Sequence, residues 1–171
     1  EDGCFYEITG EPSTPALAER FQKLGITLPE GFRTEVNLAL EPWLAAAARA
    51  MRRGFLLLID YGHPADILYN VERARGTLRC YRKHTINTNP YDRVGEQDIS
   101  VHVDFTSLIQ LGRNVGFHYL GSTSQRRFLH NLGFQEFLRA MTRLPLEQAE
   151  VDANRRGMLE LMRPDGMGEF Q

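Results

Sequence analysis

The sequence predicts an α/β fold built around a mainly parallel sheet. The apolar run at residues 55–59 ends at an acid, Asp60, and a continuous run of this length is typical of a strand buried on both faces. A helix predicted for residues 41–53 leads into this strand through Gly54, as helices do in βαβ units. Open α/β sheets bind ligands at the carboxyl ends of their strands. We therefore expect a functional site directly after residue 59.

Local signals define the other elements. Alanines at positions 45–48 favour the first helix, and Pro42 suits its first turn. Asp104 is a good N-cap for a helix at residues 105–114, and Ser124 for one at 125–132 that continues over 134–141. We further expect strands at 4–8, at 77–84, at 117–121 in the core, and at 167–171. Helical segments are expected at 16–23, at 65–75 as turns, and at 146–162. The helix at 16–23 lies inside a Pro- and Gly-rich excursion at 9–31, and a loop is expected at 85–95.

Composition narrows the class of protein. A chain of 171 residues suffices for one domain with a hydrophobic core, and the sequence contains no visible domain boundary. A net charge of -2 provides no electrostatic basis for binding nucleic acid. No apolar run approaches the roughly 20 residues of a membrane-spanning helix. Cys4 and Cys80 are too few for a disulfide framework or a zinc site, so we expect a reducing compartment.

The usual short catalytic motifs are absent: the chain has no GxxxxGK[ST], GxGxxG, HExxH or GxSxG. Polar residues instead gather around the expected strand end. Asp60, Tyr61 and His63 follow the strand directly. The next segments add five further candidates, which are Tyr81, His84, Gln97, Asp98 and His102.

A metal site is one alternative for these residues. Asp60, His63, His84, His102 and Asp104 are oxygen and nitrogen ligand types, but their spacing matches no recognised ligand pattern. The plainer interpretation is that His102 is a strand residue facing solvent and that Asp104 only caps the following helix. We therefore expect no metal.

An ordered series of segments resembles a known family. The segments are Gly31-Phe-Arg-Thr-Glu35 before a Trp-containing helix, Gly54 to Gly62, Arg75-Gly-Thr-Leu-Arg79 with Tyr81 and His84, Gly95 to Phe105, Gln125 with Phe128-Leu129, and Met167-Gly168. Together they resemble the MidA-type S-adenosylmethionine-dependent methyltransferases. That family includes the mitochondrial arginine methyltransferase that acts as an assembly factor of respiratory complex I.

The resemblance implies a Rossmann-like class I methyltransferase sheet. Residues 55–59 would be its fifth strand, and 117–121 and 167–171 its last two. The family's glycine-rich cofactor loop is not in this chain, so the resemblance implies that residues 1–171 form the C-terminal part of a single truncated domain. The strand at 55–59 would then lack neighbours and leave ladder groups unpaired. We expect such a chain to bind S-adenosylmethionine poorly, to be inactive alone, and to need a complementing chain or a homo-oligomer.

The resemblance also implies a protein arginine as the methyl acceptor, linked to respiratory complex assembly. A carboxylate clamps a guanidinium bidentately, which makes Asp60 the first choice, with Tyr61 shaping the acceptor slot and His63 as a proton relay. Tyr81, His84, Gln97, Asp98 and His102 are the expected substrate-binding residues. The structural alternative is that Asp60 only braces the loop after the strand.

Two other functions remain open at this point. The same fold could serve as a non-catalytic assembly module that uses residues 85–100 and 146–162 as its contact surface. A metal-dependent hydrolase is the third and less favoured hypothesis. The expected compartment is the bacterial cytoplasm, or the mitochondrial matrix if the source is eukaryotic.

Overall fold

The computed structural model describes residue 5 and residues 7–171, which form two compact units. The first unit contains the described residues up to Gly54 together with Gly62–Tyr119, and the second contains Phe55–Tyr61 with Leu120–Gln171. Helices and short strands occur together, which confirms a mixed α/β fold in its coarse form. The expectation of a single domain stays a prediction. None of the described helices is both long and apolar enough to span a bilayer.

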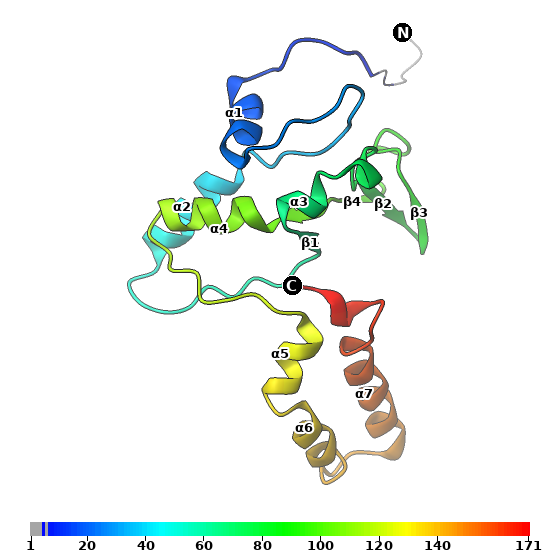
Figure 1. Ribbon diagram of the computed structural model, residues 1–171. Helices are drawn as coiled ribbons and strands as arrows, with labels where there is room; N and C mark the ends of the chain where they lie inside the picture. The colour runs from blue at the N-terminus through cyan, green and yellow to red at the C-terminus, as the bar shows by residue number, and fades with distance from the viewer. Residues whose placement is uncertain (1–4, 6) are drawn as a thin grey trace. The chain divides into compact units, whose positions relative to one another are not determined.

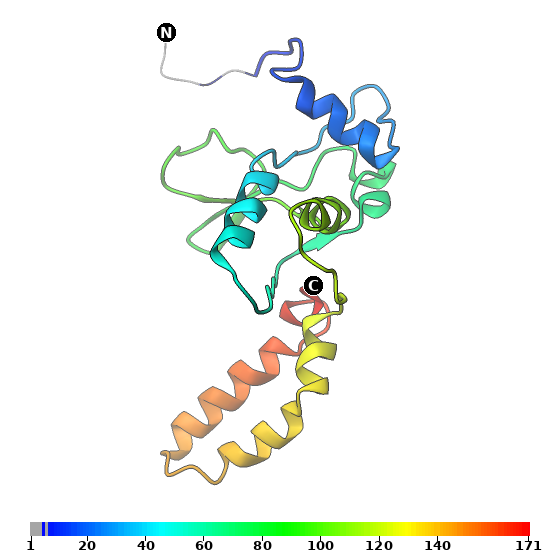
Figure 2. The ribbon, with the colours of Figure 1, turned by 90° about the vertical axis from the view of Figure 1, so that its left-hand side faces the viewer.

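The described residues of the first unit form the α-helices α1 to α4. Helix α1 (Pro15–Leu24) begins at Thr14, whose hydroxyl accepts from the Ala16 amide, and ends at Gly25 in the left-handed region with φ 68°. Helix α2 (Leu40–Ala50) buries Leu44 and lies beside α4 (Phe105–Asn114), as Figures 1 and 2 show. The short α3 (Ala65–Leu68) precedes the 3-10 turn η1 (Val71–Arg73).

A small apolar core lies between α1 and α3. Ala65, Leu68 and Tyr69 are buried there, and the rings of Phe21 and Tyr69 meet edge to face with centroids 5.2 Å apart. Leu24, Ile26 and Leu28 pack against the same cluster. The predicted helix at 16–23 is confirmed. The Pro- and Gly-rich excursion therefore covers part of the core of this unit.

Two small sheets complete the first unit. Strand β1 (Gly62–His63) runs parallel to β5 (Val103–Asp104), with Gly62 opposite Val103 and His63 opposite Asp104. The second sheet is antiparallel with the order β3-β2-β4, formed by β2 (Arg79–Arg82), β3 (Thr85–Asn87) and β4 (Asp98–Ser100). The expected strand at 77–84 is therefore present as β2. The expected loop at 85–95 is wrong at its start, where β3 forms.

The second unit is helical in its main part. It contains α5 (Gln125–Asn131), α6 (Phe134–Met141), α7 (Gln148–Leu161) and the 3-10 turn η2 (Met167–Glu169). The Ser124 hydroxyl accepts from the Arg127 amide, so the predicted N-cap of α5 is confirmed. Helices α6 and α7 form a hairpin in Figure 2. The predicted helix at 146–162 thus exists with slightly shorter bounds.

Three expected strands are not formed. Residues 55–59 are irregular and outward-facing, with Phe55 84% and Leu57 61% exposed, instead of being buried on both faces. An extended run becomes a strand only where another strand supplies ladder partners. The described backbone bonds beside it join Asp60 and Gln171, amide to carbonyl in both directions at 2.9 Å. Residues 117–121 form no strand, and 167–171 begin as the η2 turn.

The expected strand at 4–8 is the remaining case. Cys4 and Tyr6 lie outside the described residues. Phe5, Glu7 and Ile8 are described and belong to no strand. The Phe5 ring stacks on Tyr91 with centroids 5.7 Å apart, and the Glu7 carboxylate pairs with Arg33 at 2.8 Å.

Candidate functional site

Glu35 joins two segments that are far apart in the sequence. Its Oε2 accepts from the Thr77 amide at 3.0 Å and from the Thr77 hydroxyl at 3.1 Å, and its Oε1 accepts from the Leu78 amide at 3.3 Å. Gly76 has φ +76°, and a Cβ on it would lie 2.3 Å from Glu35 Oε1. Only glycine satisfies both conditions. The acid thus closes a tight carboxylate-binding turn at residues 76–78.

Thr77 extends this contact toward β5. Its side chain is buried, and its hydroxyl accepts a hydrogen bond from the His102 amide at 3.0 Å while donating to Glu35. A hydroxyl can donate and accept at once, so one buried residue links two segments. Glu35, Thr77 and His102 therefore form a continuous hydrogen-bonded path.

His63 and His102 lie close together. The pairing of β1 with β5 brings their rings to a centroid distance of 5.3 Å. Arg73 Nη2 lies 3.2 Å from His63 Nε2. A guanidinium can only donate, so His63 Nε2 accepts and the neutral ring carries its proton on Nδ1. Partial burial, then the positive charge of Arg73, and then His102 lower the pKa of His63 below its ordinary 6.5.

Both oxygens of the Asp104 carboxylate accept hydrogen bonds from neighbouring residues. It accepts from the Ser107 amide at 3.0 Å as the N-cap of α4, from the Ser107 hydroxyl at 2.5 Å and from the Tyr69 hydroxyl at 3.1 Å. Burial, together with the negative charge of Asp104, raises the pKa of Tyr69. Asp104 caps α4 as expected, but it also binds Tyr69. The expectation that His102 is a strand residue facing solvent is wrong, because it precedes β5 and is half-buried. Across the described residues, no three His, Cys, Asp or Glu side chains come together as a metal site.

Asp60 and Tyr61 lie in the second unit, at the end of the irregular run. Asp60 is exposed, and its Oδ1 accepts from the amide of the next residue at 2.7 Å. The Tyr61 ring packs on Phe170 with centroids 3.6 Å apart. The local hydrogen bond is the one expected if Asp60 braces the loop. Its exposed carboxylate remains available to a ligand.

A pocket of about 400 Å³ opens on the antiparallel sheet. It brings together three of the expected substrate-binding residues, Tyr81, Gln97 and Asp98. His84 occupies the β2–β3 turn with φ 66° and does not line this pocket. The lining also includes Arg82, Lys83, Gly95 and Glu96.

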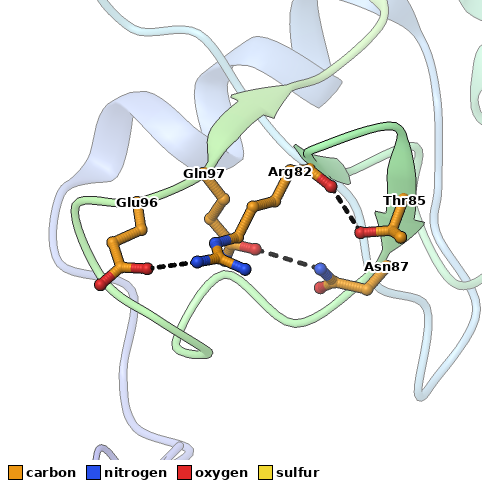
Figure 3. Close-up of polar contacts among 5 residues, drawn as sticks. All are labelled: Arg82, Thr85, Asn87, Glu96 and Gln97. Atoms are coloured by element: carbon orange, nitrogen blue, oxygen red, sulfur yellow. Dashed lines mark hydrogen bonds and ion pairs between the residues drawn. The ribbon is translucent and has the colours of Figure 1, made fainter.

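Hydrogen bonds hold the walls of this pocket in place (Figure 3). Arg82 pairs with Glu96 at 2.8 Å, and the Thr85 hydroxyl donates to the Arg82 carbonyl at 2.6 Å. The Gln97 amide oxygen accepts from Asn87 Nδ2 at 3.0 Å. Its nitrogen donates to the Asn89 carbonyl at 2.9 Å. Gln97 is therefore used to brace the 88–97 loop.

Sequence reasoning missed several residues of these sites. Glu35, Thr77 and Arg73 were not among the candidates, because their partners are 10 or more residues away. The segments that contain Glu35 and Thr77 carried the family resemblance, which was the only signal available for them. Arg82 and Lys83 had no distinguishing signal.

Comparison with known proteins identifies the family to which this chain belongs. Residues 1–123 match the family model described as "Putative S-adenosyl-L-methionine-dependent methyltransferase". The chain therefore belongs to this methyltransferase family. The resemblance to the MidA-type enzymes is confirmed. No curated protein shows significant similarity to it.

Two solved structures from Burkholderia thailandensis are similar to this chain. One is a COG1565 superfamily member bound to S-adenosyl-homocysteine, with a TM-score of 0.82, 30% identity, and coverage of 99% of this chain and 43% of that one. The other is a native structure of an uncharacterised COG1565 protein, with a TM-score of 0.76, 34% identity, and coverage of 91% and 41%. The chain thus spans less than half the length of both solved proteins.

Proposed function

We propose that this chain is the C-terminal part of an S-adenosylmethionine-dependent methyltransferase that modifies an arginine side chain of a protein. The observation that carries the proposal is the family match over residues 1–123. The similar structure that holds S-adenosyl-homocysteine, the product of methyl transfer, supports the choice of cofactor. The MidA-type resemblance suggests respiratory complex assembly as the context, and the bacterial source of both neighbours favours a bacterial cytoplasm.

Asp60 is the proposed acceptor clamp. A carboxylate is the natural partner of a guanidinium because the two pair through parallel hydrogen bonds, which would hold the acceptor nitrogen for in-line attack on the methyl group. Asp60 is exposed, and the packing of Tyr61 on Phe170 fixes the neighbouring ring. His63 is less suited to a relay through Nε2 while Arg73 donates to that atom.

Labelled methyl transfer tests this proposal. A polypeptide that carries this chain at the length of the solved relatives is incubated with cell extract and radiolabelled S-adenosylmethionine, and the protein fraction is hydrolysed to amino acids. We expect label in methylarginine, and a roughly ten- to hundredfold lower rate for Asp60→Ala, the loss expected for one charge-assisted interaction.

The matched control is Asp66→Ala, which removes another exposed acid. Equal rates for the Asp60 variant and the parent would remove Asp60 from the mechanism. Absence of any transferred label, with S-adenosylmethionine bound, would favour the non-catalytic assembly module.

A further inference from the structure

Three side chains form a row across the outer face of the antiparallel sheet. Tyr81 on β2 lies directly opposite Ile86 on β3 and directly opposite Asp98 on β4. Opposite residues in an antiparallel ladder project from the same face. Cys80, the next residue along β2, points to the other face and is 0% exposed, so that face is the inner one. Across the sheet, the row therefore runs from the apolar Ile86 through the aromatic Tyr81 to the acidic Asp98.

This row is open to solvent. Ile86 is 62% and Tyr81 43% exposed, and Asp98 is also exposed. Tyr81 and Asp98 line the 400 Å³ pocket, and Ile86 lies on the other side of Tyr81 from Asp98. The row therefore offers an aromatic face beside a carboxylate, at the mouth of a pocket whose walls are already hydrogen-bonded.

The pocket contains charged side chains of both signs. Its four charged residues are Arg82, Lys83, Glu96 and Asp98. Arg82 and Glu96 neutralise each other at 2.8 Å. Of the other two charged residues, Asp98 lies opposite Tyr81 in the sheet, and Lys83 lies in the hairpin turn between β2 and β3. Lys83 and His84 both have positive φ, 44° and 66°, as a two-residue hairpin turn between β2 and β3 requires.

We propose that Tyr81 and Asp98 form a subsite for a basic side chain of the protein acceptor, other than the arginine that is methylated. The cationic head pairs with Asp98 and lies over the Tyr81 ring, and its aliphatic stem lies along Ile86. The inference rests on the proposed function only in taking a protein as the acceptor. It gives this sheet a role in substrate selection that is separate from the acceptor clamp at Asp60.

The test is a titration of a polypeptide that carries this chain at the length of the solved relatives, without S-adenosylmethionine, followed by amide chemical shifts in NMR. The probes are acetyl-Gly-Arg-Gly-amide and its citrulline counterpart, which has nearly the same shape but no charge. We expect the arginine peptide to shift the amides of Tyr81, Lys83 and Asp98. We expect the dissociation constant to be about fivefold higher for the citrulline peptide and for Asp98→Asn, as for an exposed ion pair with a cation–π contact.

Two further variants set the sign of the charge effect. Lys83→Gln removes the opposing cation, so we expect it to lower the dissociation constant of the arginine peptide. Asp92→Asn removes an acid of the 88–97 loop that does not line the pocket, so it should leave the dissociation constant unchanged. Equal binding of the two peptides, or equal effects of the Asp98 and Asp92 variants, would overturn the proposal. Tighter binding in Asp98→Asn and weaker binding in Lys83→Gln would indicate an anion site instead and would also overturn it.

The outcome is separable from the proposed function. The peptide comparison on the unchanged chain decides the subsite even if Asp98→Asn fails to fold. A chain that binds the arginine peptide but transfers no methyl group in the labelled assay would keep the subsite and refute the enzyme. The opposite pair of results would keep the enzyme and refute the subsite.

Discussion

Gly76 shows, at the scale of one residue, why the turn at residues 76–78 requires a glycine. Its backbone adopts φ +76°, and the space where a side chain would begin is taken by a Glu35 oxygen. That oxygen cannot move away freely, because the same carboxylate accepts three hydrogen bonds from Thr77 and Leu78. The glycine and the acid therefore depend on each other.

Gly76→Ala should lower the free energy of unfolding by about 3 kcal/mol. Roughly 1 kcal/mol is the cost of a left-handed alanine, and the rest is the loss of hydrogen bonds as Glu35 is displaced. Urea unfolding measures the change. The control is Gly25→Ala, which has φ +68° with open space around the added Cβ and should cost only about 1 kcal/mol. Equal costs at both positions would show that the contact with Glu35 is unimportant.

His63 makes the stability of the protein depend on pH. Its pKa in the folded state is lowered by burial, by Arg73 and by His102. The unfolded chain therefore takes up the proton first as the pH falls, and stability that is present above the ordinary pKa of 6.5 is lost below it.

Arg73→Met removes the second of these causes and the hydrogen bond to His63 Nε2. We expect the pKa of His63, followed by NMR of the ring, to rise toward its ordinary value, and the loss of stability between pH 7.5 and 5.5 to become smaller. Arg75→Met removes a nearby exposed charge as the control. An unchanged pKa of His63 in the Arg73 variant would show that Arg73 contributes nothing to the shift.

Helix α4 illustrates what is predictable at the scale of elements. Its start at Asp104 and its end near Gly116 follow from local chemistry, a capping carboxylate and a glycine with φ 100°, so the expected bounds match the structure. The β2–β3 hairpin was missed for a local reason as well. Its turn residues are Lys83 and His84, whereas hairpin turns with positive φ usually contain Asn or Gly.

Asp104→Ala should destabilise the chain by about 2 kcal/mol, because the α4 amide loses its cap and the Tyr69 hydroxyl loses its acceptor. Asp104→Asn keeps an oxygen for the Ser107 amide and should cost about half as much. Urea unfolding of both variants measures the difference. An alanine variant no less stable than the asparagine variant would contradict the capping role.

At the scale of the whole molecule, we expect the 171-residue chain alone to show no measurable heat on titration with S-adenosylmethionine. The chain has no glycine-rich phosphate-binding motif, and its apolar run at 55–59 is largely exposed. A polypeptide at the length of the solved relatives should bind with measurable heat in the same calorimeter. Tight binding by the chain alone would overturn this expectation.

The sequence by itself determined where most helices lie, the N-caps Asp104 and Ser124, and the family, although the helix expected at 41–53 ends at Ala50. These features depend on residues three or four positions apart, or on ordered segments that can be compared along the chain. The apolar run at 55–59 shows the limit of such reasoning, because its pattern indicates a strand but cannot supply the partner that a strand requires.

Only the tertiary structure decided which polar residues meet. Glu35 reaches Thr77 across 42 positions, His63 meets His102, and Tyr81 joins Asp98 through strand register. Contacts of this kind arise from the pairing of distant backbone segments and leave no periodic trace in the sequence. The same structure left Asp60 in the other unit, exposed beside Tyr61, where local sequence had placed a single site.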